Sequence, residues 1–225
     1  MAGPLRHEPA RRLPPRPPGR RIVAAGKALC SKSDRVSEMP EPDGAAHFNL
    51  FLLRNFLDPD SCASLRAELA SAPTTQAPVY IEGTEGTIHE TVRKTTSLHP
   101  SNETIWQIQE LLSSQKSALE NHFGTRLTDC ERPQFLRYQT GDFFVRHQDG
   151  NTQQLDFDHL RVRRISIVVF LNDSFSGGSL AFYDPATTFA LMAETGLLVA
   201  FRADTFHEVL PVTSGERFTI ISWFR

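Results

Sequence analysis

The pattern of apolar and polar positions divides the chain into a helical first half and a strand-rich second half. Apolar residues recur at helical spacing over about 58–72 and again over about 101–123, so each stretch predicts an amphipathic helix. Asp58 is followed by a proline and is a candidate cap for the first of these helices. From Pro133 onward the period changes to short β-branched and aromatic runs broken by Gly, Asn, Asp and Ser, which is typical of strands.

The strands that this second half predicts follow one another closely, with no long helical pattern between them. We expect them near 134–139, 142–147, 163–171, 179–183, 196–202, 206–212 and 216–224. Short strands at such spacing after a helical half predict an α+β fold that is mainly β. The expected architecture is a β-sandwich or barrel with helices packed against one face.

The first 45 residues differ in composition from the rest of the chain. Eight of the 15 prolines precede residue 44, and the first 21 residues contain six arginines but a single acid, Glu8. Such a segment has too little apolar surface to offset the entropy of ordering it. We therefore expect a disordered Pro/Arg-rich tail over 1–45 and one folded domain over 46–225. The prolines disfavour the amphipathic helix that an organelle-targeting sequence requires.

Composition and charge exclude several broad classes of function. The chain has 24 basic and 26 acidic residues, a formal charge of −2, so no global field recruits nucleic acid or an anionic membrane. Its longest uninterrupted apolar runs, such as Ile167–Leu171 and Leu197–Phe201, are far shorter than the roughly 18 residues of a membrane-spanning helix. The three cysteines form no pair or cluster, which suits a reducing compartment and favours a cytoplasmic location. The oligomeric state stays open.

Three residues of the second half have the side chains of a metal site. His147 and Asp149 stand two residues apart at the end of a predicted strand, so both side chains point to the same face. His207 lies on another predicted strand far along the chain. Two imidazoles and one carboxylate form the facial triad of non-haem Fe(II) oxygenases, which leaves coordination positions open. Zinc is the competing metal for the same three ligands.

The last predicted strand places an arginine on an inward face. Arg217, Thr219, Ile221 and Trp223 alternate along it and share one side. A guanidinium buried without a partner costs several kcal/mol, whereas a bidentate carboxylate offsets its desolvation. Arg217 therefore predicts a bound anion. The alternatives are an internal Asp or Glu partner and a position at the outer rim.

Several of these motifs occur together and in the order seen in a known family. They are the YxxGxxFxxHxD pattern of Tyr138–Asp149, the run Arg163–Asp173, Gly177–Phe182, His207–Val212, and Gly215-Glu-Arg217 followed by Trp223. Over about residues 46 to 225 the chain resembles the 2-oxoglutarate/Fe(II)-dependent dioxygenases, specifically their prolyl 4-hydroxylase-like branch. The resemblance implies a double-stranded β-helix, or jelly-roll, core buttressed by the N-terminal helices, with the metal at its open end.

The resemblance also implies roles for individual residues. His147, Asp149 and His207 match the iron ligands, and Arg217 matches the partner of the distal carboxylate of 2-oxoglutarate. Tyr138 matches a tyrosine whose hydroxyl can reach that cosubstrate, although a core aromatic is nearly as good an interpretation.

Two further positions match residues of the substrate pocket. Trp223 matches a tryptophan that lines the pocket beyond the arginine, and in isolation it would be read as core. Arg163 falls where the branch often has an arginine at the mouth, near the substrate, but Arg164 beside it is an equal candidate. Phe170 departs from the tyrosine of many members and cannot donate a hydrogen bond. We interpret the turn-rich loop 150–160 as a lid over the substrate.

The activity implied is hydroxylation of an unactivated C–H bond, with release of succinate and CO2. The cofactors are Fe(II), with 2-oxoglutarate and O2 as cosubstrates and ascorbate as a candidate reductant. The expected substrate is a prolyl residue in a peptide, a free amino acid or another small molecule. Two alternatives stay open: a catalytically silent module that senses 2-oxoglutarate or iron, and a zinc hydrolase, for which no glutamate base stands beside the ligands.

Overall fold

The computed structural model describes residues 43–81, 84–87, 89–150, 160 and 162–225. The predicted tail up to residue 42 and nearly all of the predicted lid lie outside these residues. The first described helix, α1 (Asp43–His47), spans the boundary that we expected at residue 46. Among the described residues the chain is mostly β, with four helices, so the mainly β prediction is confirmed.

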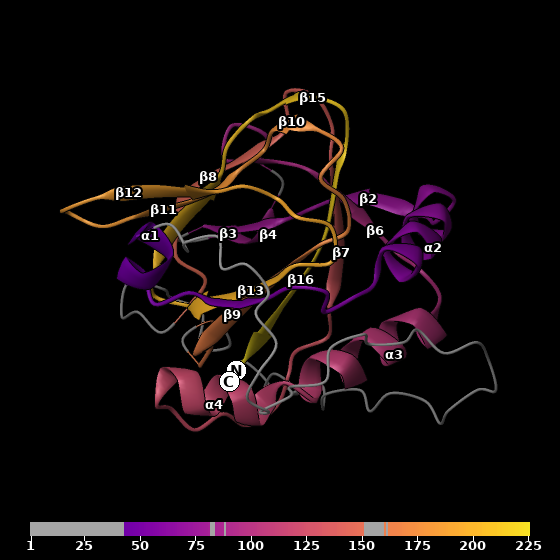
Figure 1. The fold of residues 1–225 in the computed structure, drawn as a ribbon. Helices are drawn as coiled ribbons and strands as arrows, with labels where there is room; N and C mark the ends of the chain where they lie inside the picture. The colour runs from indigo at the N-terminus through magenta and orange to yellow at the C-terminus, as the bar shows by residue number, and fades with distance from the viewer. Residues whose placement is uncertain (1–42, 82–83, 88, 151–159, 161) are drawn as a thin grey trace, which may run out of the picture.

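Two antiparallel sheets form the centre of the molecule (Figure 1). The larger one has the order β1-β13-β9-β16-β7-β6-β2, and its strands are β1 (Phe51–Leu53), β13 (Leu198–Arg202), β9 (Ile165–Phe170), β16 (Arg217–Phe224), β7 (Gln134–Tyr138), β6 (Thr96–Leu98) and β2 (Thr74–Gln76). The smaller one has the order β12-β11-β14-β8-β5, and its strands are β12 (Thr188–Leu191), β11 (Leu180–Tyr183), β14 (Phe206–Val209), β8 (Phe143–His147) and β5 (Arg93–Lys94). Two short pairs complete the fold, β10 (Ser176–Gly177) with β15 (Val212–Ser214) and β3 (Val79–Ile81) with β4 (Thr84–Thr87).

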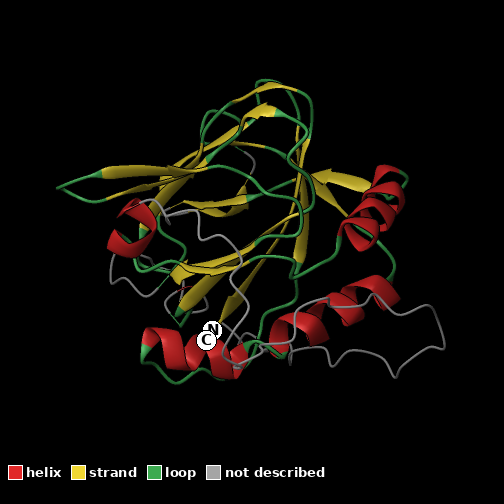
Figure 2. Cartoon of the chain, in the orientation of Figure 1, coloured by secondary structure: helices red, strands yellow, loops and turns green. Residues whose placement is uncertain are grey.

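The helices α2 (Pro59–Ala70), α3 (Asn102–Ser113) and α4 (Lys116–Phe123) cover the outer side of the larger sheet, whereas α1 packs against β12 of the smaller sheet (Figure 2). The three covering helices bury Leu69, Ile108 and Leu119 against strand residues such as Ile220. A second apolar cluster lies on the other side of this sheet, between the two sheets. The face between the sheets is therefore free of α2, α3 and α4, although Ala45 of α1 joins its apolar cluster, and a site can form there.

Each strand predicted in the second half is present, with one break. The stretch 206–212 is divided between β14 and β15, because Pro211 has no N–H with which to continue a ladder. The first predicted helix is α2, and the Asp58 carboxylate caps it by accepting from the backbone N of Ser61 at 2.8 Å. We missed β1–β6, β10 and β12, because strands of two to four residues carry no clear period.

The helix predicted over 101–123 is two helices in the structure. The α3 helix ends at Ser113 and α4 begins at Lys116. At the junction the Ser114 hydroxyl donates to the carbonyl of Leu111 at 2.7 Å, and such local side-chain bonds compete with a continuing helix. No helix among the described residues is long and apolar enough to cross a membrane.

We predict that the helix layer provides a large part of the folding free energy. Leu112 on α3 is fully buried against the larger sheet. Leu112→Ala should lower the free energy of unfolding by about 2–5 kcal/mol, since it leaves a cavity in a packed core. Urea denaturation provides the measurement. Glu110→Ala, on the exposed side of the same helix, is the control and should change stability by less than about 0.5 kcal/mol.

Candidate metal centre and anion pocket

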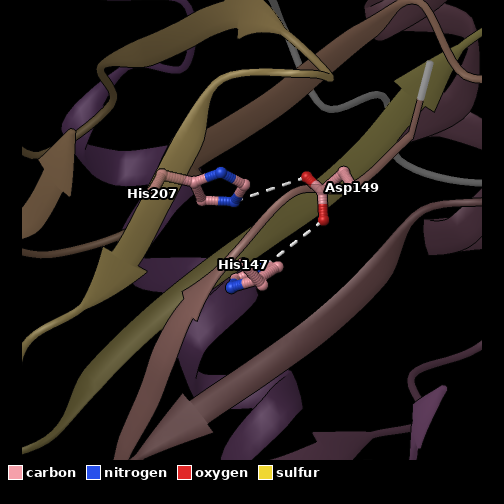
Figure 3. A group of neighbouring side chains, drawn as sticks. All are labelled: His147, Asp149 and His207. Carbon is pink, nitrogen blue, oxygen red and sulfur yellow. Dashed lines mark ion pairs between the residues drawn. The ribbon is translucent and has the colours of Figure 1, made fainter. Parts of the chain in front are cut away.

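The structure brings the three predicted metal ligands together. Residues His147 and His207 are cross-strand partners on β8 and β14, and Asp149 follows two residues after His147. The Nε2 of His147 lies 3.4 Å from Oδ1 of Asp149, and the Nε2 of His207 lies 3.5 Å from Oδ2 (Figure 3). One donor atom from each residue falls within 4.8 Å of the others.

Hydrogen bonds fix which nitrogen of each imidazole faces this centre. The Nδ1 of His147 bonds the backbone carbonyl of Val145 at 2.8 Å, and the Nδ1 of His207 bonds that of Thr205 at 2.9 Å. A carbonyl can only accept, so each Nδ1 carries the proton. In the neutral ring each Nε2 then presents a lone pair to the carboxylate, an arrangement that is typical of metal-bound histidines.

Burial sets the charges of this group. Burial, assisted by the nearby His147, lowers the pKa of His207 to about 4, so this ring is neutral at pH 7. Burial would raise the pKa of Asp149, but its interactions with His207, His147 and Arg163 outweigh that and hold it well below the usual range. The neutral imidazole of His207 and the carboxylate of Asp149 thus point at one position, and neither carries a proton on the atom that faces the other. A cation there removes the repulsion between their lone pairs.

A hydroxyl on the opposite sheet orients the carboxylate. Ser166, on the inward face of β9, is 1% exposed, and its Oγ donates to Oδ2 of Asp149 at 2.7 Å. The backbone N of Asp149 donates to the carbonyl of Ala203 at 2.9 Å. We did not single out Ser166 from the sequence. The inward alternation of the strand 163–171 was the signal that could have identified it.

The predicted anion site is a buried arginine with no acidic partner. Arg217 is 1% exposed, and its Nη1 donates to Oγ1 of Thr219 at 3.3 Å, while its Nε has no partner among the described residues. Burial lowers the pKa of Arg217 to about 10, with Tyr138 opposing the shift, so the group is charged at pH 7. No carboxylate among the described residues pairs with it, so the alternative of an internal Asp or Glu partner does not hold there. The guanidinium carbon lies 4.9 Å from the Tyr138 ring centroid and 5.0 Å from that of Phe170.

One pocket of about 390 Å³ connects the two charged groups. Seven residues that we predicted for the metal, cosubstrate or substrate site line it: Tyr138, His147, Asp149, Arg163, His207, Arg217 and Trp223. Apolar side chains such as Leu136, Val168 and Leu180 form most of the wall between them. The pocket thus places a cation site and an anion site in one largely apolar enclosure.

Arg163 differs from Arg217 in having a partner. Its Nε and Nη2 donate to the Glu131 carboxylate at 3.0 and 2.7 Å, and its guanidinium carbon stacks 3.6 Å over the Trp223 ring. This bidentate pair favours a structural role, and a substrate contact of Arg163 stays a prediction. Arg164 is exposed and does not line the pocket, so Arg163 is the better candidate of the two.

Comparisons with known proteins agree with this geometry. A family model described as the 2OG-Fe(II) oxygenase superfamily matches residues 133–225. The strand-rich second half of the chain is thus similar to this superfamily. A PKHD-type hydroxylase of Shewanella sp. (strain MR-4) is 28% identical over 181 residues, 78% of each chain. Another from Burkholderia lata is 35% identical over 96 residues, 41% of this chain and 42% of the relative.

Solved structures show the same fold. A prolyl-4-hydroxylase of Pseudomonas putida matches with a TM-score of 0.57 and 23% identity, covering 81% of this chain and 96% of the other. A prolyl hydroxylase from Trichoplax adhaerens, in complex with a hypoxia inducible factor peptide fragment, matches with a TM-score of 0.61 and 17% identity, covering 81% and 86%. The shared fold agrees with the family model and the names of the relatives, which indicate a 2-oxoglutarate-dependent, prolyl hydroxylase-like oxygenase.

Arg163 and Arg217, which are both buried, allow a matched stability test. Arg217→Met should raise the free energy of unfolding of the metal-free protein by about 1–4 kcal/mol, because it removes a desolvated charge that has no partner. Arg163→Met should lower it by about 3 kcal/mol, because it breaks a buried ion pair with Glu131. Chemical denaturation in the presence of a chelator measures both. Equal destabilisation by the two substitutions would contradict the interpretation of Arg217 as an unpaired charge.

Proposed function

We propose that this oxygenase hydroxylates an unactivated C–H bond of a prolyl residue in a peptide, of a free amino acid or of a related small molecule. The observation that carries the proposal is the convergence of His147, Asp149 and His207 in the same pocket as the unpaired Arg217. The names of the relatives support a hydroxylase, and a peptide is bound to one structural neighbour. In this proposal residues 46–225 are the catalytic domain, and the two sheets are the faces of a double-stranded β-helix.

The donor set fits ferrous iron better than a hydrolytic metal site. Two imidazoles and one carboxylate leave open positions for a chelating cosubstrate and for oxygen. A zinc hydrolase would use a nearby general base, and no glutamate lines the described part of the pocket. Glu208, next to a ligand in sequence, instead accepts a hydrogen bond from the Tyr183 hydroxyl. When bound, iron supplies the oxidising chemistry in which 2-oxoglutarate becomes succinate and CO2, one oxygen atom of O2 entering succinate and the other the substrate.

The side chains of the pocket would bind and orient the metal and the cosubstrate and would exclude water. His147 and His207 would hold the metal through Nε2, in the tautomer that their backbone partners impose. Arg217 would bind the distal carboxylate of 2-oxoglutarate, with Tyr138 across from it. The apolar walls would exclude water from the reacting groups.

Two further parts of the proposal concern the surroundings of the enzyme. Ascorbate remains the reductant that we expect to restore Fe(II). The buried free thiols of Cys62 and Cys130 are compatible with a cytoplasmic location.

We predict that Ser166 orients the metal-binding carboxylate. Ser166→Ala should weaken binding of Mn²⁺, a redox-stable substitute for Fe(II), by roughly 10-fold or more, as loss of a hydrogen bond to a metal ligand typically does. Ser166→Thr keeps the hydroxyl and should retain most of the affinity. Titration followed by the electron paramagnetic resonance of free Mn²⁺ gives both constants. Unchanged affinity in the alanine variant would contradict this role.

The proposed function is tested by anaerobic addition of Fe(II) and 2-oxoglutarate, followed by oxygen. We expect a weak visible chelate band and then succinate, and His207→Ala should lower succinate formation by at least ~100-fold because it removes a ligand. The exposed His89, which lies outside the pocket, gives the control His89→Ala, which should behave as wild type. A band without succinate would support the sensor, and no band would contradict the proposal.

A further inference from the structure

A third buried arginine lines the same pocket, and neither the metal centre nor the anion site at Arg217 accounts for it. Arg93 lies on β5, the edge strand of the smaller sheet, in register with Phe144 of β8. It is 8% exposed. Its Nη1 donates to the backbone carbonyl of Pro78 at 3.1 Å, but Nε and Nη2 have no partner.

No acidic group among the described residues neutralises Arg93. The nearest carboxylates along this edge are engaged elsewhere: Asp142 pairs with Lys94 at 3.3 Å, and Glu90 accepts from Gln76 at 2.7 Å. A buried guanidinium satisfied only by a carbonyl and an aromatic face retains most of its desolvation cost. Arg93 therefore has the same property that marks Arg217 as an anion site.

The charge balance of the pocket indicates what kind of ligand is missing. With the proposed cofactors bound, the charges of Fe(II), Asp149, dianionic 2-oxoglutarate and Arg217 cancel. Arg163 is neutralised by Glu131, and an imidazole that binds a metal is neutral. Arg93 is then the one described charge of the pocket that remains uncompensated. A neutral peptide carbonyl would leave it so, whereas a carboxylate would neutralise it.

The position of Arg93 ties this charge to the reaction centre. Its guanidinium carbon lies 4.7 Å from the Phe144 ring centroid, and the Phe144 and His147 ring centroids are 3.7 Å apart. One aromatic side chain thus contacts both the arginine and a proposed metal ligand. Pro78 and Val92 complete an apolar surround on the same side of the pocket.

We infer that Arg93 binds a carboxylate of the primary substrate, so that the substrate is a carboxylic acid and not the interior of a peptide chain. This inference rests on the proposed function of the same pocket. The carboxylate can belong to a free amino acid or to the C-terminal residue of a peptide. Arg93 is in this view a specificity-determining residue, separate from the cosubstrate site at Arg217.

The test compares acids with their neutral counterparts on the enzyme loaded anaerobically with Fe(II) and 2-oxoglutarate. The acid probes are the proteinogenic amino acids in three forms: the free acid, the N-acetyl acid and the C-terminal residue of a glycyl dipeptide. The neutral probe for each acid is the same compound with its carboxylate replaced by a carboxamide. Binding is followed by the shift of the chelate band, and turnover by succinate and by a product heavier by one oxygen atom. At least one acid should bind roughly 30-fold or more tightly than its amide, equivalent to about 2 kcal/mol. The free and dipeptide acids distinguish the two sources of the carboxylate.

Variants assign this discrimination to one side chain. In Arg93→Gln the preference for acid over amide should fall to about 3-fold or less, and Arg93→Lys should retain part of it because it keeps the charge. The control Lys94→Gln removes the adjacent charge, which is half-exposed and outside this pocket, and should leave the preference unchanged. A merely structural role of Arg93 would weaken acid and amide equally.

The outcomes separate the inference from the proposed function. Three results obtained while the chelate band is present would overturn the inference alone. They are that no acid binds, that amides bind as tightly as acids, or that Arg93→Gln still prefers the acid to the amide. Absence of the band and of succinate in the wild-type protein would overturn the proposed function first. A misfolded Arg93→Gln variant would show no chelate band, and Arg93→Lys then decides the question.

Discussion

The site depends on one buried carboxylate that joins both sheets. Asp149 follows the end of β8 in the smaller sheet, its side chain accepts from Ser166 of the larger sheet, and its backbone N donates to Ala203 after β13. The same carboxylate faces His147 and His207. Ser166 and the backbone contact fix the position of this carboxylate, which holds it where the two imidazoles meet it.

At the other end of the pocket, the burial of Arg217 lowers the stability of the fold. A folded chain would not bury Arg217 without a carboxylate for stability alone, since an apolar residue of that volume packs there at no desolvation cost. An anion at Arg217 offsets this cost, so in the proposed function cosubstrate binding and folding would be coupled. The pocket is thus most stable when it is loaded. The paired Arg163, which stacks on Trp223, shows how the same fold treats an arginine that has a structural partner.

The sequence predicted the parts of this site that follow from alternation within a strand. The spacing of His147 and Asp149 and the inward face from Arg217 to Trp223 both depend on a period of two, which the structure confirms. Contacts between strands were harder to predict. The Glu131 partner of Arg163 comes from an irregular segment before β7, and Arg93 lies on a strand of only two residues, too short to show a period. The helix break at Ser114 depends on a local hydroxyl bond that apolar spacing does not record.

The location of the residues along the chain suggests how reaction and selectivity are divided. The segment matched by the family model, 133–225, contains the proposed metal ligands, Arg217 and Tyr138, that is, the groups required for chemistry common to the family. Arg93, Pro78 and Val92 lie before it and approach the pocket from its edge. An edge strand can change its side chains without disturbing the ladders that hold His147 and His207 in register, because it pairs on one side only. In the proposed function, substitutions in the first half of the chain can therefore change substrate selectivity while the second half preserves the reaction. A substitution of a charged edge residue such as Arg93 would have the largest energetic effect.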